Sequence, residues 1–434
     1  MSIAGTSSPS TGSPSRQPSS TGAAGFLERY ERLAGRLPGD SALRAAAAAA
    51  FRASGVPGGT QQRRAEAWKY TSLRAVAEAN FQTDGAPRHE AETFLAALPL
   101  LDAPRVIFEN GVLRDDLTTL PAAGFSRFAE QPDFGTLSWP DREPMVALNT
   151  MLAEDGAALH VPAGHDGGLL QLVSIASRDA DFHPRHSVHL GKGARLTMLE
   201  ISTGQGIYLL NSVAEIHLAE GAHLTHIRLQ DEAGGAFHVS TSYVEVEADA
   251  TYDSFTLNLG ARLSRTEVHT QLVGAGAIAH LNAAQLLTGS QHGDFSSVVS
   301  HSAPGCTSRQ TVKNVLDGRS RAVFQGKIEV ARQAQKTDGY QMNQALLLSP
   351  YAEIDSKPEL EIFADDVKCS HGATVGELDA EQLFYLRSRG IPDPEARSIL
   401  VRAFLAEALD AVVDDAIRSR LEVAVERWWE RQKA

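Results

Sequence analysis

Apolar residues at the start of the chain follow helical spacing. They recur at three- and four-residue steps between residues 26 and 37, and a Pro-Gly pair at 38–39 ends this run. An Asp-Ser pair at 40–41 can cap a second helix, and residues 63–81 place apolar side chains among charges in the pattern of an amphipathic helix. We therefore predict an N-terminal helical domain over residues 25–100.

The next segment, residues 101–157, changes character. An apolar run at 106–108 leads through Asn110-Gly111 into a second short apolar run, which is the signal of a β-hairpin. Residues 145–152 then show the pattern of one short helix. We predict a connecting hairpin and helix here.

Between residues 158 and 377 an internal repeat replaces helical periodicity. Four segments with the sequences VHLGKGARL, IHLAEGAHL, VEVEADATY and QLVGAGAIA align so that the alanines at 194, 222, 250 and 277 fall 28, 28 and 27 residues apart. A weaker copy at 346–354 places Ala352 at an equivalent point. Each unit has two alternating β-runs around a small-residue corner and is too short to bury its own apolar face, so successive units must stack. We predict a mainly β fold with a β-helix core over residues 158–377; the alternative is a β-sandwich.

Helical spacing returns after residue 377. Three stretches, at 379–388, 393–409 and 411–431, place apolar residues at i, i+3 and i+4. They predict a C-terminal α-helical domain over residues 378–434, a size that suits an appendage or a docking face.

Residues 1–24 are rich in Ser and Pro and carry one charge, Arg16. They lack the hydrophobic region of a secretory signal, and their composition predicts a disordered tail. No window of the chain approaches the ~18 consecutive apolar residues that a transmembrane helix needs. The expected location is therefore cytoplasmic.

The charge balance and the cysteine count limit the possible chemistry. The chain has 40 Lys and Arg against 53 Asp and Glu, and the net charge of -13 argues against binding nucleic acid by phosphate neutralisation. Its two cysteines, Cys306 and Cys369, are too few for a disulfide framework or a four-thiolate site. Thiol chemistry must therefore recruit other residue types or another chain.

The sequence Cys369-Ser370-His371 is the first candidate site. On a strand, residues i and i+2 point to the same face, so the thiolate and the imidazole can approach one ion or cluster together. The neighbouring Asp365 and Asp366 could assist with iron. The alternative is a buried cysteine and a hydrogen-bonded histidine with no ligand role.

Other thiol and imidazole groups favour structural roles. Cys306 follows a Pro-Gly pair and is interpreted as a structural thiol near a turn. His183, His186 and His189 have an HxxHxxH spacing, but three-residue steps on extended chain alternate faces, so a polar ladder explains them better than a metal. His189 and His217 occupy equivalent repeat positions and would stack on adjacent rungs.

Common enzyme signatures are missing from the sequence. There is no GxxxxGK[ST] phosphate loop, no GxSxG and no HExxH, so we predict that this chain binds no nucleotide. A β-helix enzyme acting on polysaccharide and a purely structural solenoid adaptor stay open as alternative functions.

One long run carries a family resemblance. Residues 308–391 contain KPELEI, ADDVKCSHGATVG and LFYLRSRGI, and this run resembles the core of the SufB/SufD family of iron-sulfur cluster assembly proteins. The segments EAWKYTSLR at 66–74 and ALNTMLAEDGAALHVPAG at 147–164 are also similar to the family. The resemblance runs from about residue 60 to residue 405.

The resemblance implies a right-handed parallel β-helix flanked by N-terminal and C-terminal helical domains. It implies a non-catalytic scaffold subunit that pairs with SufB through the β-helix and binds the SufC ATPase through its C-terminal helices, with ATP hydrolysed by SufC. It also implies a transient Fe-S cluster shared with SufB, with His371 and the neighbouring Cys369 at the assembly site. The shortage of cysteines favours the SufD branch.

For SufC docking we predict the apolar face of the helix at 393–409. Its residues are Ile399, Leu400, Phe404 and Leu405.

Overall fold

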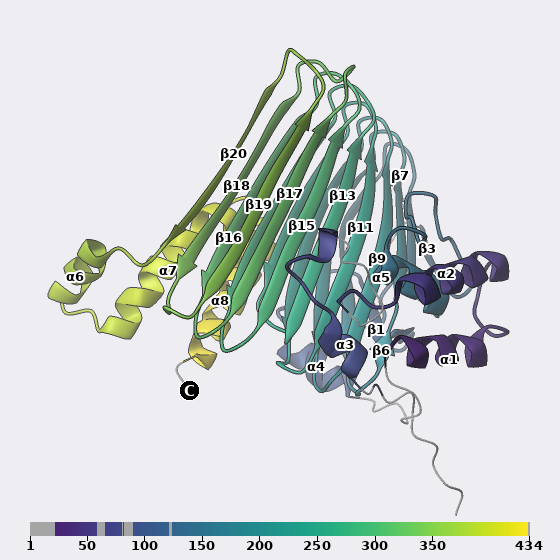
Figure 1. The fold of residues 1–434 in the computed structure, drawn as a ribbon, viewed down its shortest axis with the longest axis horizontal. Helices are drawn as coiled ribbons and strands as arrows, with labels where there is room; N and C mark the ends of the chain where they lie inside the picture. The colour runs from purple at the N-terminus through teal and green to yellow at the C-terminus, as the bar shows by residue number, and fades with distance from the viewer. Residues whose placement is uncertain (1–21, 59–65, 80, 82–89, 121–123, 433–434) are drawn as a thin grey trace, which may run out of the picture.

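The computed structural model describes residues 22–58, 66–79, 81, 90–120 and 124–432. All but the last three residues of the predicted tail at 1–24 lie outside these ranges. The chain winds into a long solenoid of parallel strands with helices at both ends (Figure 1). The predicted parallel β-helix is therefore confirmed, and the β-sandwich alternative is wrong.

Two sheets form the walls of the solenoid. Sheet A has the order β2 (Val112–Leu113), β1 (Arg105–Glu109), β5 (Asp166–Ala176), β8 (Arg195–Gly204), β10 (His223–Glu232), β12 (Thr251–Asn258), β14 (Ile278–Leu287), β16 (Thr307–Leu316), β18 (Asp338–Leu347) and β20 (Lys368–Gly376). Sheet B has the order β19 (Glu353–Ile362), β17 (Arg321–Val330), β15 (His292–His301), β13 (Leu263–Leu272), β11 (Phe237–Val246), β9 (Leu209–Leu218), β7 (Arg185–Leu190), β4 (Ala157–Val161) and β3 (Gly124–Arg127), and β6 (Asp181–Phe182) pairs with β9. From β7 onward consecutive strands alternate between the sheets, so each rung contributes one strand to each wall.

The predicted hairpin at 106–113 exists, since β1 and β2 pair in antiparallel fashion. Its first strand has a second role that the sequence did not reveal. β1 also pairs in parallel with β5, so it extends sheet A instead of only connecting two domains.

The corner alanines explain why the repeat stacks. Ala194, Ala222, Ala250 and Ala277 are at most 1% exposed and belong to the core between the two sheets. The residue before each of them has a positive φ: 65° at Gly193, 68° at Gly221, 55° at Asp249 and 72° at Gly276. The left-handed backbone turns the chain from sheet B into sheet A, and glycine adopts it without steric cost. A larger side chain in the alanine position would collide with the neighbouring rungs.

The prediction that the copy at 346–354 is equivalent to the other corners is wrong. Ala352 lies between β18 of sheet A and β19 of sheet B, whereas the other corner alanines lie where the chain passes from sheet B to sheet A. Both corners need a small buried residue, so composition alone could not distinguish them.

Helices cover the outer faces of both sheets. The N-terminal ones are α1 (Ala23–Leu33), α2 (Ser41–Ser54), a 3-10 turn at Glu66–Trp68, α3 (Arg74–Glu78), α4 (Ala91–Ala97) and α5 (Pro144–Leu152), and the C-terminal ones are α6 (Ala380–Ser388), α7 (Asp393–Leu409) and α8 (Asp415–Arg431). Asp40 caps α2 by accepting hydrogen bonds from two backbone amides, as predicted. The short amphipathic helix predicted within 63–81 is confirmed only for α3, where Val76 is buried; the described chain before it contains the 3-10 turn.

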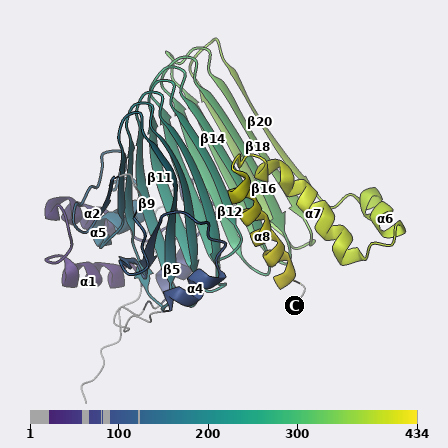
Figure 2. The same cartoon turned by 180° about the vertical axis from the view of Figure 1, so that it is seen from behind.

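Burial of apolar surface holds these helices in place. Residues of α1, α2 and α5 share one apolar cluster with Leu209, Phe237 and Val239 of sheet B, and α7 and α8 share another with the outer face of sheet A, which Figure 2 shows from behind. Among the described residues no helix combines the length and apolar character that crossing a membrane requires.

The EAWKYTSLR segment is held on sheet B by apolar and polar contacts, since Trp68 and Leu73 belong to the apolar cluster shared with that sheet. The guanidinium of Arg265 lies 4.2 Å from the centroid of the Trp68 ring, and the Thr71 hydroxyl donates to Asp294. Arg265 and Asp294 are themselves paired. These contacts hold the chain ahead of α3, and the helix that the sequence pattern favoured is limited to Arg74–Glu78.

A buried ion pair between neighbouring rungs should dominate local stability. Arg185 on β7 donates to Glu215 on β9 at 2.6 Å, and both side chains are 1% exposed. We expect Arg185→Met to destabilise the chain by about 3–5 kcal/mol, because it leaves the Glu215 carboxylate buried without its partner. The urea midpoint of the purified protein measures this loss.

The matched control is an exposed pair that also joins neighbouring rungs. Lys192 lies 2.9 Å from Glu220, and these side chains are 68% and 52% exposed. Lys192→Met should change stability by no more than about 0.5 kcal/mol, since solvent screens such a pair. Equal effects of the two substitutions would contradict the role given to the buried pair.

Candidate functional site

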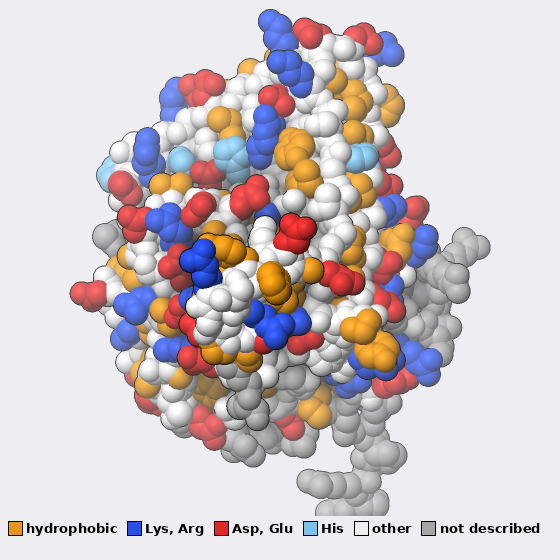
Figure 3. Space-filling view, turned by 90° about the vertical axis from the view of Figure 1, so that its left-hand side faces the viewer, with side chains coloured by type: hydrophobic (Ala, Val, Ile, Leu, Met, Phe, Trp, Pro, Cys, Tyr) orange, Lys and Arg blue, Asp and Glu red, His pale blue; other side chains and the backbone are white. Residues whose placement is uncertain are grey.

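The C-terminal end of the solenoid is open. β20 is the last strand of sheet A and β19 the last strand of sheet B, so each has one edge without a neighbouring strand among the described residues. Figure 3 shows hydrophobic side chains among charged ones on the face of the molecule at this end, and Phe363 and Val375 are among the exposed apolar residues there. Unpaired strand edges with apolar neighbours are templates for pairing with another chain.

Cys369 and His371 lie together on this edge strand. In the β18–β20 register Cys369 is opposite Gly339 and His371 is opposite Gln341. Both partners on β18 are buried residues that point into the solenoid, so the thiol and the imidazole face the same way at the uncovered last rung. This confirms the shared face predicted from the i, i+2 spacing.

The two side chains differ in environment. His371 is exposed, whereas Cys369 is half-buried against Ile328, Val330 and other apolar residues. Burial raises the pKa of the Cys369 thiol, and the nearby Asp338 carboxylate adds to the shift, while a backbone hydrogen bond from Gly339 opposes it. The free thiol is therefore protonated at neutral pH and must lose its proton when it binds a metal.

This pair is an incomplete ligand set. Among the described residues, no third His, Cys, Asp or Glu completes a compact three-ligand group around it. Asp365 and Asp366, which the sequence suggested as aids, lie exposed in the loop before β20, and the backbone of Asp366 is bonded to Gln335 and Lys336. Further ligands for a cluster at this site must come from outside this chain.

A second surface lies between α6 and α7. An open pocket of about 840 Å³ is lined by Ile399 and Leu400 of α7 together with Phe384, Tyr385 and Leu386 of α6. Phe384 is 74% exposed. Aromatic and aliphatic side chains that line an open pocket are typical anchors of a protein interface.

The structure separates the four residues predicted for docking. Ile399 and Leu400 line the pocket, as expected for an accessible surface. Phe404 packs partly against the solenoid, with the Lys313 ammonium 4.6 Å from its ring centroid. Leu405 is 0% exposed, so the expectation that it faces a partner is wrong in this conformation, because it is used to attach α7 to sheet A.

Comparisons with known proteins identify the family. The model of the SUF system FeS cluster assembly SufBD core domain matches residues 173–404, and that of the SufBD N-terminal region matches residues 40–167. The chain belongs to the SufB/SufD family. The predicted role as a scaffold protein of iron-sulfur cluster assembly is confirmed at this level, which favours it over a polysaccharide-active enzyme or a purely structural adaptor.

Individual SufB/SufD relatives support the SufD branch. The iron-sulfur cluster assembly protein SufD of Escherichia coli is 32% identical over 84% of this chain and 88% of its own length. A SufBD family protein of Synechocystis is 33% identical over 84% of this chain and 86% of its own length. SufB of Bacillus subtilis is 25% identical over 75% of this chain and 72% of its own length. The higher identity to SufD agrees with the branch predicted from the cysteine count.

Cys306, the other thiol of this SufB/SufD chain, occupies a further corner of the solenoid. It follows Gly305, whose φ of 70° matches the other left-handed corner residues. Its thiol is fully buried and donates to the backbone oxygen of Gly274 at 3.2 Å, and burial raises its pKa. These contacts agree with the structural role inferred from sequence, and Cys306 follows Gly305 as Ala277 follows Gly276, which is the repeat signal that marks its corner position.

The histidines of the HxxHxxH run do not converge. His183 is bonded to Asp181 at 2.8 Å, His186 accepts from the amide of Ala157 at 3.1 Å, and His189 stacks on His217 with centroids 4.8 Å apart. The predicted imidazole ladder is thus present on adjacent rungs, and these three residues form no joint metal site.

Sequence reasoning assigned no docking role to the aromatic residues of α6. Phe384 and Tyr385 lie in the LFYLRSRGI motif, which served only to support the family resemblance. Their exposure next to α7 marks them as part of the pocket surface. The two adjacent aromatic residues in a predicted short helix were the sequence signal that could have indicated a docking surface.

Proposed function

We propose that this chain acts as a SufD-like, non-catalytic scaffold subunit. It pairs with SufB through the open end of the solenoid, and SufC binds in the α6–α7 pocket and hydrolyses ATP. The Fe-S cluster is cargo that His371 and Cys369 hold together with ligands from SufB before transfer. The proposed location is the cytoplasm.

The position of Cys369 and His371 carries this proposal. A thiol and an imidazole lie on one face of a strand whose outer edge has no neighbour among the described residues, and those residues supply no compact third ligand. A partner strand added to that edge would bring its own side chains to the same rung, completing both the backbone hydrogen bonds and the ligand set.

Co-expression with SufB and SufC from the same genome tests the proposal as a whole. We expect a stable complex of the three chains that assembles a cluster under anaerobic conditions, measured by iron and sulfide content and visible absorbance. The isolated chain should hydrolyse no ATP. Failure to co-purify with SufB would overturn the proposal.

A single proline on the free edge tests how SufB pairs. The amide of Lys368 donates to Thr337 beside β18, so the amides of alternate residues, including Thr374, point toward β18, and that of Ala373 points to the free edge. Ala373→Pro removes an outward donor and should weaken SufB binding by about 10-fold or more, because one partner carbonyl in the interface is left unsatisfied. Affinity is measured by titration with purified SufB.

Two further variants make that result specific. Ala373→Val keeps the amide donor and should bind SufB nearly as the unchanged chain does. Thr374→Pro removes a donor to β18 and should lower the stability of the last rung itself. Unchanged SufB affinity in Ala373→Pro would exclude strand addition at β20.

A further inference from the structure

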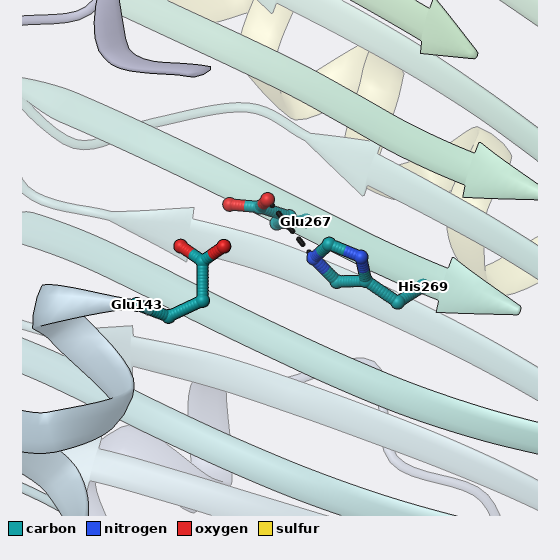
Figure 4. A group of neighbouring side chains, drawn as sticks. All are labelled: Glu143, Glu267 and His269. Atoms are coloured by element: carbon teal, nitrogen blue, oxygen red, sulfur yellow. Dashed lines mark hydrogen bonds and ion pairs between the residues drawn. The ribbon is translucent and has the colours of Figure 1, made fainter. Parts of the chain in front are cut away.

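A separate group of potential ligands lies on the outer face of sheet B, away from the open end (Figure 4). Glu267 and His269 are two residues apart on β13 and point to the same side, and Glu143 stands at the start of α5 with its carboxylate directed toward them. Their candidate ligand atoms all lie within 4.8 Å of one another. Within the described ranges no other set of three such residues is as compact.

The contacts within this group leave the Glu143 carboxylate without a hydrogen-bond or ion-pair partner among the described residues. His269 Nε2 lies 3.0 Å from one oxygen of Glu267, and Arg265 donates to the other oxygen at 3.0 and 3.1 Å. Arg265 also pairs with Asp294, so its single positive charge is shared. The Glu143 carboxylate has no hydrogen bond or ion pair to any residue that the structure describes.

Burial makes this arrangement of charges costly. Desolvation and the neighbouring Glu267 raise the pKa of Glu143 to about 7. Two carboxylates that face one imidazole in a half-buried position repel each other, and a cation between them would offset both the repulsion and the loss of water.

Tyr243 supplies an independent indication of a ligand. Its side chain is 4% exposed, and its hydroxyl has no hydrogen-bond partner among the described residues. Its ring stacks on His269 with centroids 4.8 Å apart, and it lines a pocket of about 280 Å³ together with Glu143 and His269. A buried hydroxyl without a partner beside such a pocket is explained by a bound ion or its water.

We propose that Glu143, Glu267 and His269 bind one divalent first-row transition-metal ion. Two carboxylates and one imidazole without a thiolate suit Fe²⁺, Mn²⁺ or Zn²⁺. Two ligands at right angles, each about 2.1 Å from an ion, lie about 3.0 Å apart, which matches the separation of Glu267 and His269. On binding, the proton between these two atoms leaves to solvent, and water from the pocket fills the remaining positions.

The ion would join α5 to the wall of the solenoid at a point remote in sequence from Cys369 and His371. The metal-site proposal does not rest on the proposed assembly role, so either proposal can be overturned while the other holds. The variants below distinguish them.

Anaerobic titration of the metal-free full-length chain with Co²⁺ tests the proposal, because its visible absorption reports the ligand set. We expect one equivalent to bind and Fe²⁺, Mn²⁺ or Zn²⁺ to displace it in competition. Glu143→Gln should weaken binding by about 10-fold or more. Because the Glu143 carboxylate makes no hydrogen bond to a described residue, this variant should fold normally. His269→Ala should lose the imidazole contribution to the spectrum.

Two controls fix the location of binding. Glu245→Gln removes the partner of His217 on the same sheet face and should leave Co²⁺ affinity unchanged. His217 and Glu245 lie 3.5 Å apart, and no third ligand among the described residues joins them. His371→Ala should also leave it unchanged. Absence of stoichiometric binding, or binding lost in His371→Ala and retained in Glu143→Gln, would overturn the proposal.

Discussion

In a complex with SufB and SufC, His371→Ala should reduce cluster assembly by about 10-fold or more. His371 is an exposed side chain on the free edge of β20, and it would act as a direct ligand to the growing cluster. Even substitutions one shell away from a metal typically cost about 10–100-fold, so removing a ligand should cost at least the lower value. Iron content and visible absorbance of the anaerobically purified complex measure the effect.

The structure predicts that this loss is not a folding defect. The His371 side chain makes no hydrogen bond to another described residue, so the variant should unfold at the same urea concentration as the unchanged chain. His160 is an exposed histidine on β4, near the other end of the solenoid, and His160→Ala should assemble clusters normally. His371→Cys, which keeps a metal ligand at this position, should retain part of the yield. An unchanged cluster yield in His371→Ala would remove His371 from the site.

Phe384→Ala should weaken binding of SufC by roughly 30-fold or more while leaving this chain stable. The Phe384 side chain is 74% exposed beside the α6–α7 pocket, so its removal costs little in folding. Aromatic anchors in an interface commonly contribute about 2 kcal/mol or more, which corresponds to roughly 30-fold in affinity. Titration with purified SufC and urea unfolding of the variant measure the two properties separately.

Leu405 lies on the side of α7 that packs against sheet A, away from the pocket. Its substitution should lower stability without weakening SufC binding. Leu405 is fully buried against sheet A, and Leu405→Ala should lower stability by about 2–5 kcal/mol while SufC still binds wherever the variant is folded. Val413, which is 86% exposed between α7 and α8, is the control, and Val413→Ala should change neither property. Full SufC affinity in Phe384→Ala would place the dock elsewhere.

The solenoid was predictable because its rules are local and repeated. Each rung needs the same alternation of side chains and the same small corner residue, so alanines 28, 28 and 27 residues apart disclose both the strands and their stacking. The pairing of Cys369 and His371 was predictable for a similar reason, since the i, i+2 spacing places both on one face of any strand. Neither conclusion depended on a distant segment.

Contacts between segments far apart in sequence were not predictable in this way. Helical spacing predicted the helix α7, but α7 has apolar residues on more than one face, and Leu400 and Leu405 look equivalent until α7 is laid on sheet A. Likewise residues 63–81 have a helical pattern, yet Trp68 and Thr71 are held instead by Arg265 and Asp294 of the sheet. In both cases long-range packing decided between local alternatives of similar energy.

The sequence by itself determined the class of fold, the family and the strand that carries Cys369 and His371. Periodicity, corner chemistry and motifs each depend on residues that lie close together in the chain. Only the tertiary structure decided that β20 is left as a free edge, that Leu405 belongs to the core, and that Glu143 meets His269. Glu143 and His269 are brought together by the packing of α5 on sheet B, and such a contact leaves no periodic signal along the chain.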